Sequence, residues 1–216
     1  MAEPRNNNPY DQLLQEAPEE LHPVLQFITD HIKLFAIGIG AILLIVGAYA
    51  GFSAYQDSQV EKAENELGAI LIIQDPAERI EKLNDFLGKA PGETDISARL
   101  ALAKACMEQK DFQKAADVWG ELKNENENFR FVAWLGQTKC LLLAGKPEAA
   151  LGELSKMRSE APPTYNLMIN RQAGEAAESA GQYAEAIRNY QELAPQVPPQ
   201  DRAYLEARIK TLEAKL

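Results

Sequence analysis

The chain has 216 residues, enough for one ordinary domain with short appendages. Its formal net charge of −10 and pI near 4.8 argue against a nucleic-acid partner and against electrostatic binding to anionic lipid, because both need clustered Lys and Arg. It contains only two cysteines, Cys106 and Cys140, which excludes a disulfide-rich scaffold.

Residues 1–33 form an N-terminal tail. The first part, residues 1–12, is polar and is predicted to be disordered. Beyond Pro18, apolar residues recur at helical spacing as far as Ile32. This pattern predicts a short amphipathic helix next to the membrane, lying on the bilayer surface or against a partner.

The following segment, residues 34–56, is 23 residues long and contains no charged side chain. A helix of this length spans roughly 34 Å, which matches a hydrocarbon core of about 30 Å. Lys33 and Asp57 bracket the segment, and aromatic residues gather near its C-terminal end. A buried core helix would show a polar face, which is missing before Ser53. The segment therefore predicts one transmembrane helix.

A cleaved signal peptide is the alternative, because Ala48-Tyr49-Ala50 after an apolar run is a pattern that signal peptidase recognises. The preceding region argues against cleavage. Its 33 residues carry six acidic and two basic side chains, whereas a signal peptide begins with a short positive region.

The orientation of the span is not decided by charge. Lys33 before the span and Lys62 after it are the only basic residues within about 15 positions of its ends, so the positive-inside rule gives a tie. Because Lys33 is the nearer to the membrane, we expect a cytoplasmic N-terminus.

Small residues lie one helical turn apart within the span. Gly47 and Gly51 form one such pair, and Ala36 and Gly40 form another. Such pairs let another helix approach closely, so the span is predicted to pack against a second copy, giving a homodimer, or against another membrane protein. The alternative is that glycine is simply frequent in membrane helices.

After Asp57 every apolar pattern is helical, and the sequence repeats with a period of 35 to 36 residues. Such a period predicts helix-turn-helix units that cannot bury their apolar faces alone and therefore stack on their neighbours. The turns that anchor the period are Asp75-Pro76, Asp111-Phe112, Lys146-Pro147 and Gln182-Tyr183.

These units resemble the tetratricopeptide repeat. The unit from Leu167 to Pro198 matches best, with Gly174, Gly181, Tyr183, Ala186 and Tyr190 at the expected places. The resemblance implies an all-α fold in which the transmembrane helix is followed, over residues 57–216, by a tetratricopeptide-type α-solenoid. The solenoid would contain about four helix pairs and a terminal helix that covers the last apolar face.

The layout as a whole is similar to the YfgM-like family of ancillary Sec translocon subunits. The resemblance implies a bacterial inner-membrane protein with a cytoplasmic N-terminus and a periplasmic repeat domain. It also implies translocon subunits and periplasmic chaperones or secreted clients as partners. The sequence itself contains no cofactor motif, so no cofactor is predicted.

In the tetratricopeptide register, the first helix of each unit lines an inner groove. The groove positions are mostly apolar, with three cations in an otherwise acidic domain. Such a strip indicates a docking surface for an extended or helical apolar segment, the alternative being that some of these residues are core. The positions are Leu100, Lys104, Met107, Val132, Leu135, Lys139, Leu142, Leu143, Met168 and Arg171.

The sequence predicts a binding protein rather than an enzyme. Its only histidines, His22 and His31, precede the end of the span, which removes Ser-His-Asp and Cys-His arrangements from the repeat domain. There is no Gly-rich phosphate loop and no zinc or calcium motif. Cys106 and Cys140 fall late in the first helices of adjacent units, where they either pair in an oxidising compartment or stay buried as small apolar residues.

Two other functions are compatible with these residues. In one, the repeat domain faces the cytoplasm as a scaffold for assembly of another membrane complex. In the other, cleavage after Ala50 releases a soluble periplasmic organiser of the cell envelope.

Overall fold

The computed structural model describes Phe27 and residues 31–216. Within these residues it contains nine α-helices, two short 3₁₀ helices and no strand, which confirms the expected all-α fold. The predicted amphipathic helix of the tail lies largely outside the described residues. The chain divides into two units, Met1–Gln59 and Val60–Leu216. The α-helices are α3 (Ile32–Leu71), α4 (Pro76–Leu87), α5 (Gly92–Glu108), α6 (Phe112–Glu125), α7 (Arg130–Leu143), α8 (Pro147–Glu160), α9 (Asn166–Ser179), α10 (Tyr183–Leu193) and α11 (Pro199–Glu213).

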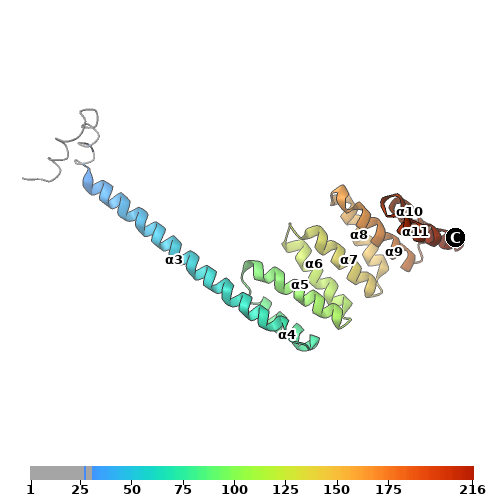
Figure 1. Cartoon of the computed structure of the whole chain (residues 1–216), viewed down its shortest axis with the longest axis horizontal. Coiled ribbons are helices and arrows are strands. Elements are labelled where there is room, and N and C mark those ends of the chain that lie inside the picture. Colours follow the sequence, from blue (N-terminus) through green and yellow to red (C-terminus); the bar gives the residue numbers. More distant parts are fainter. Residues whose placement is uncertain (1–26, 28–30) are drawn as a thin grey trace, which may run out of the picture. The chain divides into compact units, whose positions relative to one another are not determined.

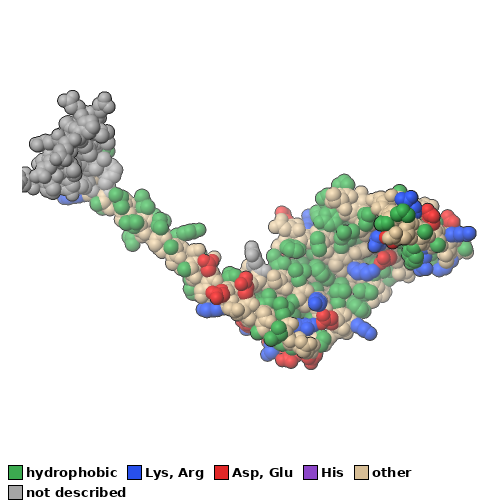
Figure 2. Space-filling view, viewed as in Figure 1, with side chains coloured by type: hydrophobic (Ala, Val, Ile, Leu, Met, Phe, Trp, Pro, Cys, Tyr) green, Lys and Arg blue, Asp and Glu red, His purple; other side chains and the backbone are tan. Residues whose placement is uncertain are grey.

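Helix α3 contains the predicted span and continues beyond it. Its large apolar side chains at Leu34 and from Ile37 to Tyr55 are exposed, and Figure 2 shows apolar side chains along the helix up to the first acidic ones. The helix is long and apolar enough to cross a membrane. No glycine or proline lies between Gly51 and Gly68, so nothing in the local sequence ends the helix at Gln56.

The C-terminal part of α3 supplies the first helix of the repeat unit. Ala63, Leu67 and Ile70 recur every three to four residues, as one face of a helix requires, and all three are buried in the hydrophobic core. The first repeat therefore buries an apolar face as the others do.

Helices α4 to α11 stack in chain order, each in contact with the next (Figure 1). Helices α4, α6, α8 and α10 begin at Pro76, Phe112, Pro147 and Tyr183, the four positions that anchor the sequence period. The helix-turn-helix units and the terminal helix α11 are thus confirmed.

The turns within the units follow from their residues. The Asp111 carboxylate accepts a hydrogen bond from the backbone N–H of Lys114 at 3.1 Å and caps α6, and Asp75 caps α4 in the same way. Gly145 and Gly181 have φ angles of 72° and 74°, in the left-handed region that glycine adopts without steric cost. The chain can therefore reverse sharply after α7 and α9.

Aromatic rings lie directly against the backbone of neighbouring helices. A Cβ atom added at Gly174 of α9 would lie 2.3 Å from Cε1 of Tyr190 on α10. One added at Gly136 of α7 would lie 2.5 Å from Cδ2 of Trp119 on α6. Glycine is required at both positions because any side chain there would occupy the space of a ring.

A polar cluster fastens α6, α7 and α8 together. The Lys123 ammonium donates to Gln137 Oε1 and Glu153 Oε2, each at 2.9 Å, and the Trp134 indole N–H donates to Glu153 Oε2 at 2.8 Å. Burial raises the pKa of Glu153, but hydrogen bonds from Lys156, Lys123 and Trp134 outweigh it and hold this pKa below its usual value. Glu153 therefore stays ionised where three helices meet.

Cys106 and Cys140 are both buried and both free thiols. Burial raises the pKa of Cys106, and it raises the pKa of Cys140 to about 11, with a further contribution from Cys106 itself. Both thiols are therefore held in the protonated form at neutral pH.

We expect Gly174→Ala to lower the free energy of unfolding by about 1–3 kcal/mol, because the new methyl group would overlap the buried Tyr190 ring. Gly152→Ala is the matched control. Gly152 lies inside α8 with open space around it, so alanine there should be neutral or stabilising by up to about 1 kcal/mol. Urea denaturation followed by circular dichroism measures both, and equal effects of the two substitutions would contradict the packing described.

We expect neither thiol to react with maleimide in the folded protein at pH 7. The thiolate is the reacting species, and raised pKa values with burial keep Cys106 and Cys140 protonated and inaccessible. Mass spectrometry should find two additions only after denaturation in urea. Rapid labelling of the native protein, or a mass two hydrogens lower, would be incompatible with two buried free thiols.

Candidate partner-binding groove

The predicted groove residues lie on α5, α7 and α9. Nine of the ten are at least partly exposed. The exception is Leu135, which is 9% exposed and belongs to the hydrophobic core. The exposed residues are Lys104, Val132, Lys139, Leu143, Met168 and Arg171, and the partly buried ones are Leu100, Met107 and Leu142.

Three exposed apolar side chains occupy equivalent positions in successive units. Val132 of α7, Met168 of α9 and Tyr204 of α11 are spaced 36 residues apart, and each directly precedes a buried residue of its helix. Their exposed fractions are 49%, 52% and 67%. We call Val132, Met168 and Tyr204 the apolar ladder.

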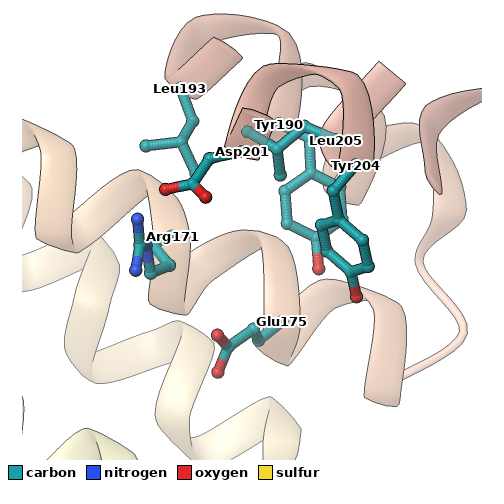
Figure 3. Close-up of a pocket in the computed structure, with 7 residues that line it drawn as sticks. All are labelled: Arg171, Glu175, Tyr190, Leu193, Asp201, Tyr204 and Leu205. Atoms are coloured by element: carbon teal, nitrogen blue, oxygen red, sulfur yellow. The ribbon is translucent and has the colours of Figure 1, made fainter. Parts of the chain in front are cut away.

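Two adjoining cavities open between α7, α9, α10 and α11. The smaller, of about 250 Å³, is lined by α9, α10 and α11, and Figure 3 shows the side chains of Arg171 and Asp201 facing each other. The larger, of about 500 Å³, extends to Lys139, Leu142 and Leu143 of α7. We call the two cavities together the C-terminal groove. Both are lined by Glu175, Tyr190 and Tyr204.

Ion pairs cross the groove between helices. Lys139 of α7 pairs with Glu175 of α9 at 2.7 Å. The Arg208 guanidinium of α11 contacts both carboxylate oxygens of Glu178 on α9, and its Nε donates to Glu178 Oε2 at 2.9 Å. Such bidentate contacts fix the orientation of both partners, so this pair holds the terminal helix against α9.

Tyr190 forms part of the groove floor. Its hydroxyl donates to Glu178 Oε2 at 3.2 Å, the same carboxylate that Arg208 contacts. Burial raises the pKa of Tyr190 well above its usual value, and the charge of Glu178 raises it further. The phenol therefore remains a neutral hydrogen-bond donor at every physiological pH.

The charges that line the groove balance. It contains three cations, Lys139, Arg171 and Arg208, and three carboxylates, from Glu175, Glu178 and Asp201. The side chains of Arg171 and Asp201 form no ion pair or hydrogen bond with any other described residue. The groove is thus a neutral surface in a protein whose net charge is −10.

Sequence reasoning missed the residues that α10 and α11 contribute. Tyr190 was recognised only as a repeat position, and α11 was expected only to cover the last apolar face. The sequence period contained the missing signal for Tyr204, since this residue follows Met168 by the 36 residues that separate Met168 from Val132.

Gly47 and Gly51 lie on the exposed surface of α3. Apart from the adjacent residues and the nearby backbone of α3 itself, no atom of the described residues comes within 4 Å of a Cβ atom built on either glycine, and the same is true of Gly40. The space beside these glycines is therefore open, as a second helix would require. Packing of the span against another helix stays a prediction.

The model of the tetratricopeptide repeat-like domain family matches residues 26–214, most of the chain. Domains of this kind typically bind proteins rather than catalyse reactions. Comparisons with curated proteins and with solved structures found no match. The stacked helix pairs, the turns that begin each second helix and this match lead to one conclusion: the chain belongs to the tetratricopeptide repeat-like domain family.

Proposed function

We propose that the chain is a membrane-anchored adaptor. In this proposal residues 34–56 of α3 hold it in a membrane, and the C-terminal groove with the apolar ladder binds a segment of another protein. The observation that carries the proposal is the exposure of Val132, Met168 and Tyr204 at equivalent positions of three helices. Leaving such side chains in water costs free energy that a bound apolar surface would recover.

A more specific role is as an ancillary subunit of the Sec translocon in the bacterial inner membrane. The support is the layout, in which a short tail and a single span precede a repeat domain. In this role the N-terminus is cytoplasmic and residues 57–216 are periplasmic. The span would contact translocon subunits or a second copy through Gly47 and Gly51, and the groove would receive periplasmic chaperones or secreted clients.

Two alternative roles differ in topology and are separable by experiment. If the domain is a cytoplasmic scaffold for assembly of a membrane complex, protease added to intact spheroplasts will leave it uncut, whereas a periplasmic domain will be degraded. If cleavage after Ala50 releases a soluble envelope organiser, the mature protein will begin at Gly51, which intact-mass measurement detects.

We expect Met168→Glu in the full-length protein to reduce the yield of co-purified partner proteins about tenfold. A carboxylate placed against an apolar partner surface loses its hydration without gaining an opposite charge. A loss of about 1.4 kcal/mol in binding free energy lowers the affinity tenfold. Met168 is 52% exposed, so the substitution should leave the fold intact.

Ser155→Glu is the control, because Ser155 is exposed on α8, outside the groove. Quantitative mass spectrometry of the protein purified from membranes after crosslinking in cells provides the measurement. An unchanged yield with Met168→Glu, or an equal loss with Ser155→Glu, would exclude the apolar ladder as the binding surface.

A further inference from the structure

We infer that a second copy of this chain packs in parallel along helix α3, on a face that continues from the span into the water-exposed part of the helix. The inference rests on the proposed membrane anchor. It deepens that proposal, because it selects one of the partners considered for the span and extends the contact beyond the membrane. It does not involve the groove, so it can fail while the adaptor function stands.

The free side of α3 lies opposite the side that packs into the repeat domain. Ala63, Leu67 and Ile70 are buried in the hydrophobic core. Asn65 is two positions from both Ala63 and Leu67, which is about 200° around a helix that turns about 100° per residue. Asn65 and Gly68 are exposed. Apart from the adjacent residues and the nearby backbone of α3, no described atom lies within 4 Å of a Cβ atom built on Gly68, so this side is open to a second helix.

A heptad pattern runs along this free side. One set of residues recurs every seven positions and is small except at one place: Gly40, Gly47, Ala54, Glu61 and Gly68. A second set with the same period alternates with it: Leu44, Gly51, Ser58 and Asn65. Spacings that alternate between three and four keep both sets on one seam, as in a left-handed coiled coil, and small residues let two helices approach closely. We call these nine residues the α3 seam.

A second copy meets the α3 seam in register. Two copies anchored by the same span enter the membrane in one direction and to the same depth, so equivalent positions of their α3 helices face each other. Because α3 is one continuous helix, the rotation that brings the two Gly47 residues together also brings the two Asn65 residues together. The Asn65 amides can then hydrogen-bond to each other, and a polar Asn in a seam fixes the register of two helices.

The charges beside the α3 seam are complementary between parallel copies. Asp57 and Lys62 flank the seam on opposite borders, at the positions that form ion pairs between the helices of a parallel coiled coil. Lys62 of each copy would therefore face Asp57 of the other, with Glu61 of the seam beside it. None of these three side chains forms an ion pair with any other described residue. A different membrane protein would match neither these charges nor the extension of the seam past the span.

Cysteine crosslinking in native membranes tests the contact. The full-length variants Ser58→Cys and Asn65→Cys carry the new thiol in the seam, and Gln59→Cys and Glu66→Cys carry it one position away. Neighbouring residues point about 100° apart, so only the seam positions bring two Cα atoms within the roughly 7 Å that a disulfide spans. A mild oxidant is added, free thiols are blocked before denaturation, and a non-reducing gel gives the yield of linked dimer. The unsubstituted chain reports linkage through the two native cysteines.

Linked dimer from Ser58→Cys and Asn65→Cys is the expected result, with several-fold less from Gln59→Cys, Glu66→Cys and the unsubstituted chain. Linkage at Ser58 without linkage at Asn65 would confine the contact to the end of the span and overturn the inference. Equal yields at seam and control positions, or no linked dimer, would overturn the second copy as the occupant. None of these outcomes bears on the groove.

A charge reversal tests the pairing across the seam. Adding Lys62→Glu to Ser58→Cys should lower the yield of linked dimer several-fold, because like charges then face each other. Adding Asp57→Lys as well should restore the yield. A yield that ignores both substitutions would contradict the parallel, in-register arrangement.

Discussion

The rings of Trp119 and Tyr190 rest on the backbone at Gly136 and Gly174, and this close approach sets the distance between the helices that they join. Each helix pair has too little apolar surface to be stable alone, so every unit depends on such contacts with its neighbours. Helices α7, α9 and α11 are connected through α8 and α10, which contact the helices on either side of them.

The groove combines apolar side chains with three cations and three carboxylates, among which Lys139 pairs with Glu175 and Arg208 with Glu178. Glu178 accepts hydrogen bonds from Tyr190 below and from Arg208 beside it, which places the terminal helix at the edge of the groove. Because Glu178, Tyr190 and Arg208 hydrogen-bond to one another, they fix the shape of the groove and add little to its net charge. Binding would then draw on the exposed side chains of Val132, Met168 and Tyr204, whose contact with a partner removes apolar area from water.

Much of the fold was predictable from residue pattern. The turns at Pro76, Phe112, Pro147 and Tyr183 were located correctly because proline, glycine and capping residues act locally and recur with the period. Continuation of α3 past Gln56 also follows from sequence, since no helix-breaking residue stands there. These local sequence signals predict the turns correctly because the packing between units favours the same backbone conformations.

The groove was less predictable, for reasons that particular residues illustrate. Helix α7 is apolar on nearly every side, so periodicity could not show that Leu135 faces the core while Val132 faces water. Tyr190 reaches the groove floor from a second helix of its unit, and Arg208 reaches Glu178 across 30 positions of sequence. Contacts of this range depend on the packed structure and leave no local trace.

Hydroxyl-radical footprinting of the full-length protein tests the central claim most directly, by comparing native membranes with the purified chain. Met168 and Tyr204 are exposed and chemically reactive, whereas Met157 is buried and serves as the internal reference. If a partner covers the apolar ladder, Met168 and Tyr204 will be oxidised readily in the purified chain and protected in membranes, with Met157 unchanged. Equal oxidation of Met168 and Tyr204 in both preparations would contradict the account.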